Sequence, residues 1–89
     1  MNGMQIWEVN GIDDLEGVCF AQCSTKEKAE KAIQILEENG FYKCNKCYLV
    51  NLRHVRSVHD GMALVGNDQL QVSRARKKAF AEAVADYIG

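Results

Sequence analysis

The sequence predicts an α+β fold with the element order ββαββα, in which two helices cover one face of an antiparallel-rich sheet. Three observations support this prediction. Short runs of β-branched, aromatic and aliphatic residues, bounded by turn-forming residues, lie at 4–9, 18–22, 47–58 and 62–65. Apolar residues recur at helical spacing in segments 25–39 and 69–89. Asp60-Gly61 is a two-residue hairpin signal between the last two strands.

The first two strands are expected to form an antiparallel hairpin. The acidic connection between them, which contains Asp13, Asp14 and Glu16, is too short for a helical crossover between parallel strands. A hairpin is therefore the economical connection.

The first helix has the clearest local signals. Ser24 and Glu27 have the spacing of a capping box, and Gly40 stands where a left-handed residue ends a helix. The apolar stripe between these signals consists of Ala29, Ala32, Ile33 and Leu36. We expect a helix from about Thr25 to Asn39.

The third strand is expected to run without a break from Cys47 to Val58. Strand alternation puts its apolar residues on the face that meets the helix: Tyr48, Val50 and Leu52, followed by His54. In the last helix, the predicted inner stripe is rich in alanine, with Phe80 at one edge and Val84 and Tyr87 as its optional extension: Val72, Ala75, Ala79 and Ala83.

The length and composition predict one globular domain, residues 1–89, with 47% hydrophobic residues and a formal net charge of −1. This balance gives no overall attraction to nucleic acid, so such binding requires a local patch. Apolar runs fall short of the ~20 residues of a membrane span, and the N-terminus lacks a signal pattern. We expect a cytoplasmic protein with reduced thiols.

The block 17-GVCFAQCSTKEKAEKAIQILEENGFY-42 resembles a pattern found in small bacterial and phage proteins of uncharacterised function. The resemblance covers roughly residues 4–52 and rests on a strand followed by an STKEKAEKAI-like helix start. It implies a compact ββαβ core and brings no catalytic residues.

Four cysteines raise the hypothesis of a structural zinc domain, because a Cys₄ set is common in such sites. If the second strand reaches Cys23, however, its thiol lies about 13 Å from that of Cys19. Two thiols that far apart cannot both bind one zinc at about 2.3 Å. We therefore expect no cofactor and free cysteines that pack as small apolar residues. Zinc remains the alternative for Cys19, Cys23, Cys44 and Cys47.

No pattern in the sequence predicts catalysis. The CxxC pair does not open a helix, where a redox-active thiol is usually found, and His54 and His59 are expected as ordinary strand and hairpin residues. The chain is predicted to be non-enzymatic.

Basic residues are concentrated in the second half of the chain. A nucleic-acid-binding surface is therefore one hypothesis, and the solvated face of an amphipathic helix is the competing explanation. The residues of the hypothetical surface are Arg53, Arg56, Arg74, Arg76, Lys77 and Lys78.

If both helices cover one sheet face, small apolar residues are left on the other face. Such a face favours burial against a second copy of the chain. The residues of this predicted self-association surface are Trp7, Val9, Cys19, Ala21 and Cys23. The main prediction is a small bacterial or phage interaction protein that binds a protein partner and forms a homodimer. The alternatives are a nucleic-acid-binding protein and a zinc domain.

Overall fold

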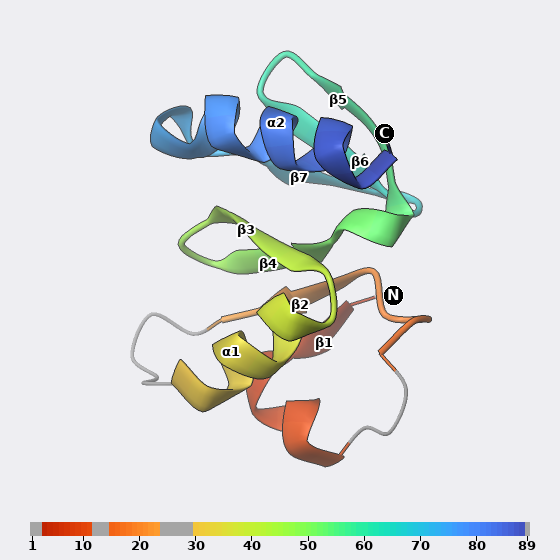
Figure 1. Cartoon of the computed structure of the whole chain (residues 1–89), viewed down its shortest axis with the longest axis vertical. Helices are drawn as coiled ribbons and strands as arrows, with labels where there is room; N and C mark the ends of the chain where they lie inside the picture. Colours follow the sequence, from red (N-terminus) through yellow and green to blue (C-terminus); the bar gives the residue numbers. More distant parts are fainter. Residues whose placement is uncertain (1–2, 12–14, 24–29, 89) are drawn as a thin grey trace.

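The computed structural model describes residues 3–11, 15–23 and 30–88 (Figure 1). The chain measures 32 × 25 × 23 Å along its principal axes. The strands are β1 (Gly3–Gln5), β2 (Phe20–Gln22), β3 (Phe41–Asn45), β4 (Tyr48–Asn51), β5 (Val55–His59), β6 (Met62–Val65) and β7 (Asp68–Gln71). The helices are α1 (Glu30–Glu38) and α2 (Lys77–Ile88), and short 3₁₀ helices are η1 (Ile6–Gly11), η2 (Leu52–His54) and η3 (Arg74–Arg76).

The described strands form two sheets rather than one. The first is four-stranded with the order β1-β2-β4-β3, and the second is three-stranded with the order β5-β6-β7. Apart from the β1–β2 pair, every pairing among these described strands is antiparallel. The predicted α+β class, the antiparallel-rich pairing and the presence of two helices are confirmed.

The first two strands pair in parallel, so the predicted hairpin between them is wrong. Residues Ile6 to Val9 leave the strand and begin η1, and the chain then returns to the starting end of β1. There Gly3 lies opposite Phe20. A Cβ atom on Gly3 would come within 2.3 Å of the Phe20 ring, so glycine is required for this close approach.

The predicted single strand from Cys47 to Val58 is interrupted. It leaves the first sheet at Asn51, makes one turn of 3₁₀ helix in η2, and enters the second sheet at Val55. The chain therefore uses one apolar run to build parts of two sheets.

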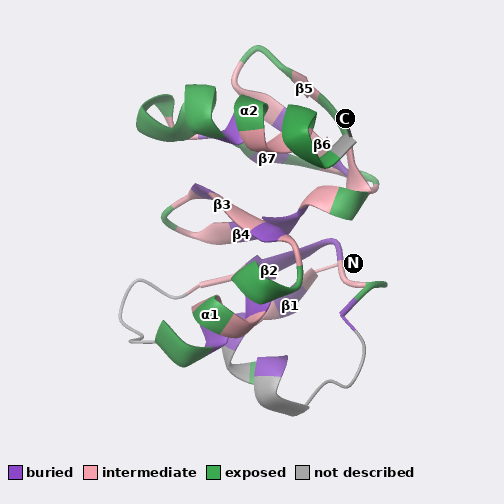
Figure 2. Ribbon diagram, viewed as in Figure 1, coloured by how far each residue is buried: buried purple, intermediate pink, exposed green. Residues whose placement is uncertain are grey.

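The two helices lie on opposite faces of the first sheet, which corrects the prediction that they share a face. Ala32 and Leu36 of α1 pack in one buried cluster with Leu49 of β4. Phe80 of α2 packs in a second cluster with Val50, the next residue of β4. Successive strand residues point to opposite faces, so the two clusters lie on the two sides of the sheet. Figure 2 shows buried segments above and below β4.

The second cluster fills the space between the two sheets. It joins Val50 to Ala63, Val65 and Leu70 of the second sheet, with the ring of Phe80 fully buried among them. Phe80 is thus the centre of the buried face of α2 rather than its edge. Ala75 and Ala79, which were predicted to lie inside, are exposed.

The signals that end the first helix and turn the hairpin are confirmed. Gly40 has φ +85° after α1, and Asp60 and Gly61 have φ values of +51° and +76° in the β5–β6 turn. The predicted capping box at Ser24 and Glu27 lies outside the described residues.

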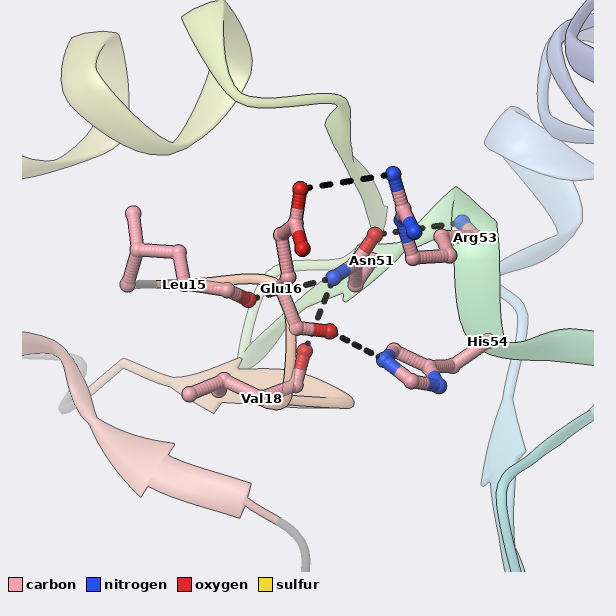
Figure 3. A network of polar contacts seen from close by, with 6 residues as sticks. All are labelled: Leu15, Glu16, Val18, Asn51, Arg53 and His54. Atoms are coloured by element: carbon pink, nitrogen blue, oxygen red, sulfur yellow. Dashed lines mark hydrogen bonds and ion pairs between the residues drawn. The ribbon is translucent and has the colours of Figure 1, made fainter.

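A buried polar network holds the chain where it passes from one sheet to the other (Figure 3). Asn51 is only 3% exposed, and its amide donates hydrogen bonds to the carbonyls of Leu15 (3.3 Å) and Val18 (2.9 Å). Its side-chain oxygen accepts a hydrogen bond from the main-chain N–H of Arg53 at 3.1 Å. The ring of His54 bonds the carbonyl of Glu16. One amide therefore joins the segment before β2 to the start of η2.

None of the described helices is long and apolar enough to cross a membrane.

Replacing Asn51 by alanine is expected to lower the free energy of unfolding by about 2–3 kcal/mol, because buried main-chain groups lose their partners. Urea denaturation measures this change. The exposed α1 residue Gln34 provides the control: Gln34→Ala should change the same quantity by less than about 0.5 kcal/mol. Equal effects of the two substitutions would contradict the role given to Asn51.

Candidate nucleic-acid interface

The edges of the two sheets meet at β3 and β7. At this seam the β3–β4 pairing shifts register between Lys43 and Asn45, so that Cys44 is an extra residue in the ladder. The carbonyl of Cys44 accepts a hydrogen bond from the N–H of Ser73 at 2.8 Å. The side-chain amide of Asn45 donates to the carbonyl of Gln71 at 2.5 Å. The first sheet is thus bonded to the end of β7.

A hollow of about 470 Å³ opens beside this seam. We call it the seam groove, and it is lined by Asn45, Lys46, Cys47, Tyr48, Gln71, Ser73 and Arg76. Its two cationic residues come from different parts of the fold. Lys46 lies in the β3–β4 turn, and Arg76 ends η3, which follows β7. Both are exposed.

A second hollow of about 210 Å³ shares Gln71 with the seam groove. Arg74 and Lys77 line it together with Asp60 at the β5–β6 turn. The two hollows form a track with cationic residues along its length and amide and hydroxyl groups between them. Such a mixture suits a partner that carries both phosphates and hydrogen-bonding edges.

The structure divides the predicted basic surface. Arg74, Arg76 and Lys77 line the track, and Lys78 is the exposed second residue of α2. Arg53 instead lies in η2, where its guanidinium is 3.6 Å from the Glu16 carboxylate. Figure 1 places η2 at the end of the molecule opposite the β3–β4 turn and the start of α2.

Arg56 is exposed on β5, a strand that contributes no residue to the seam groove. The predicted surface did not include Lys46, which the structure places in the lining of the seam groove. The signal available in the sequence was a cation at the tip of a tight turn.

None of the four cysteines forms a disulfide, and they occupy two kinds of environment. Cys19 and Cys44 are buried in the core between the sheets, whereas Cys23 and Cys47 are half-buried. Within residues 3–11, 15–23 and 30–88, no three His, Cys, Asp or Glu side chains come together as a metal-binding set. The zinc hypothesis therefore has no ligand cluster among the described residues.

The two buried thiols have raised pKa values. Burial raises the pKa of Cys44 to about 11, although main-chain hydrogen bonds and the nearby charge of Arg76 act in the opposite direction. Burial, with a smaller contribution from Asp68, also raises the pKa of Cys19. Both thiols are neutral core groups at physiological pH.

The predicted self-association face is not an open surface. Val9, Cys19 and Ala21 are at most 5% exposed. Cys19 packs between the sheets and Ala21 packs under α1, because β2 begins only at Phe20 and the assumed alternation does not extend to Cys19. Cys23 is half-buried against the α1 cluster, and the side chain of Trp7 lies outside what the structure describes.

Residues 21–85 match the model of a family described as the LytTR DNA-binding domain. No curated protein and no solved structure matches the chain. The match overturns the resemblance to uncharacterised bacterial and phage proteins. It also extends beyond His54, to which that resemblance did not reach. It favours the nucleic-acid-binding alternative over the protein-binding prediction, and the family's described role is binding rather than catalysis.

At pH 8, a thiol reagent is expected to label Cys47 and to leave Cys44 almost unmodified in the folded protein. Cys44 is fully buried and its pKa of about 11 leaves about one thiol in a thousand ionised. Its labelling rate should rise about tenfold per pH unit toward pH 10. Mass spectrometry resolves the two sites, because trypsin cleaves after Lys43 and Lys46 and separates the cysteines. Equal labelling rates in the folded protein, as expected after denaturation, would contradict the buried position.

Proposed function

Because the chain belongs to the LytTR family of DNA-binding domains, we propose that it binds duplex DNA through the seam groove and the adjoining hollow. The observation that carries this proposal is the convergence of four cations on one track, from the β3–β4 turn, η3 and the start of α2. These cations are Lys46, Arg74, Arg76 and Lys77. They are the residues to which we assign phosphate contacts.

The charge of the protein as a whole does not explain such binding, since its formal net charge is −1. A neutral protein attracts a polyanion only where its cations are gathered and its anions are placed elsewhere. Exposed acidic residues lie on α1, on the other side of the first sheet: Glu30, Glu37 and Glu38. Asp60 is the carboxylate among the residues that line the two hollows, beside four cations. The excess of cations there, with acidic residues on α1 behind the sheet, supports the track as the DNA-facing side.

Sequence reading requires groups that contact base edges as well as phosphates. Gln71 is exposed and lines both hollows at the middle of the track. A glutamine amide pairs in a bidentate manner with adenine in the major groove. We therefore assign base contact to Gln71 and orientation on the backbone to the flanking cations.

Tyr48 does not favour a single-stranded ligand. It is half-buried, and its ring meets that of Phe20 edge-on at a centroid distance of 5.6 Å. Single-strand binding of the stacking type requires exposed aromatic faces in series. Duplex DNA is the ligand that the composition of the track favours.

The double substitution Lys46→Glu with Arg76→Glu should weaken binding to a fluorescent duplex of mixed sequence by at least about tenfold at moderate salt. Fluorescence anisotropy across a salt series measures it. The wild-type plot of log affinity against log salt should have a slope of roughly −3 to −4, and the variant slope should be shallower by about 2. Lys31→Glu on α1 is the matched control and should leave the slope unchanged. An equal loss of duplex affinity in this control, or no loss in the double variant, would contradict the proposed surface.

Removing the carboxylate of the track should have the opposite sign. Asp60 is beside Arg74 and Lys77 and forms an exposed pair with His59 at 3.1 Å. Asp60→Asn removes a repulsion toward phosphate and should raise duplex affinity about two- to threefold at low salt. Asparagine tolerates the φ of +51° at this position, so the turn should persist. The control Glu38→Gln on α1 should leave affinity unchanged; a weaker duplex complex of Asp60→Asn would count against the track.

A further inference from the structure

Asn45 holds the two sides of the seam groove together through its side-chain amide. The side-chain oxygen accepts a hydrogen bond from the N–H of Cys47 at 2.7 Å, within the turn that carries Lys46. The side-chain nitrogen donates to the carbonyl of Gln71 at 2.5 Å, at the end of β7. A single planar group thus bonds to one segment from each sheet.

The bulge at Cys44 makes this contact available. Because Cys44 is extra in the β3–β4 ladder, its carbonyl is directed to the N–H of Ser73 rather than to β4. Its thiol, fully buried, lies 3.7 Å from the Gln71 carbonyl. Two successive residues of β3 therefore contact the last residue of β7 and the residue that precedes η3.

Asparagine is the residue whose chemistry fits both contacts. The turn requires an acceptor and the Gln71 carbonyl requires a donor, and the amide supplies both from one short side chain. Aspartate keeps the acceptor and loses the donor, and alanine loses both. The amide of Asn45 is occupied inside the protein, so its role differs from that of a residue that reads a base.

We propose that Asn45 is a positioning residue for sequence discrimination, because it fixes the spacing of Lys46 from Gln71 and Arg76. The inference rests on the proposed DNA-binding function. Attraction between cations and phosphates tolerates small displacements, whereas bidentate contact with a base edge does not. Loss of the Asn45 contacts therefore lowers the preference for one sequence while the general affinity for DNA persists.

The test begins with the preferred duplex, selected by the wild-type protein from a random library, and a scrambled duplex of the same composition. For Asn45→Ala, affinity for the selected duplex should fall at least about tenfold, and affinity for the scrambled duplex should stay within about twofold. Asn45→Asp should lose the same preference. Asn39→Ala is the matched control, since it removes a side-chain hydrogen bond of 2.7 Å to the Ile35 carbonyl at the end of α1. It should keep the wild-type ratio.

Amide hydrogen exchange provides a second readout that does not depend on DNA. The N–H of Ser73 should exchange at least about tenfold faster in Asn45→Ala than in the wild type or in Asn39→Ala. Unchanged exchange at Ser73 overturns the positioning role. Where the wild type binds DNA, an unchanged ratio of the two affinities in Asn45→Ala also overturns it, whether both affinities stay the same or both fall equally. A wild type that binds no duplex refutes the proposed function itself, and that result is distinct from the other two.

Discussion

The architecture depends on how the chain leaves one sheet and enters the next at Asn51. A strand that passes between sheets exposes main-chain groups at the break, and buried groups of this kind must find partners. Asn51 supplies them from a single buried amide that reaches Leu15, Val18 and Arg53. The N–H of Leu52 is bonded in turn to the carbonyl of Gly40 at 3.0 Å. Since these partners come from three separate segments, the direction in which β5 departs is fixed by the rest of the first sheet.

With this junction fixed, the two sheets are connected at two places. Near η2 the two sheets are joined by the chain itself. At the other end they meet as strand edges, where β3 contacts β7 through Cys44 and Asn45. Between these ends lies the apolar core centred on Phe80, which fills the gap but has no directional bonds of its own. The proposed DNA-binding track lies along the second seam. Its geometry is therefore a property of sheet packing rather than of one mobile loop.

The sequence reveals those features that depend on neighbours in the chain. Gly40 and Asp60-Gly61 predict their turns through local conformational preference. Leu49 and Val50 point to opposite faces of the sheet, as the strand alternation predicts. The break at Asn51 is invisible in the sequence, because its hydrogen-bond partners Leu15 and Val18 are 36 and 33 residues away. β7 could have been predicted from the sequence. Leu70 and Val72 are buried, while Gln69 and Gln71 are exposed, and this alternation has the two-residue period of a strand. The cationic surface could not be predicted in the same way, because Lys46 and Arg76 line one groove only when the two sheets pack together.

The segment Cys44-Asn45-Lys46-Cys47 shows that residue spacing alone does not determine where the side chains point. Its spacing suits two thiolates on one metal, yet the bulge turns Cys44 into the core and leaves Cys47 at the groove. A neutral buried thiol then packs against β7, the amide of Asn45 spans the seam, and the cation of Lys46 remains outside. The tight turn suggested by a CxxC pair is present. What it presents to solvent is a positive charge held in place by an amide, and that combination suits contact with a phosphate backbone.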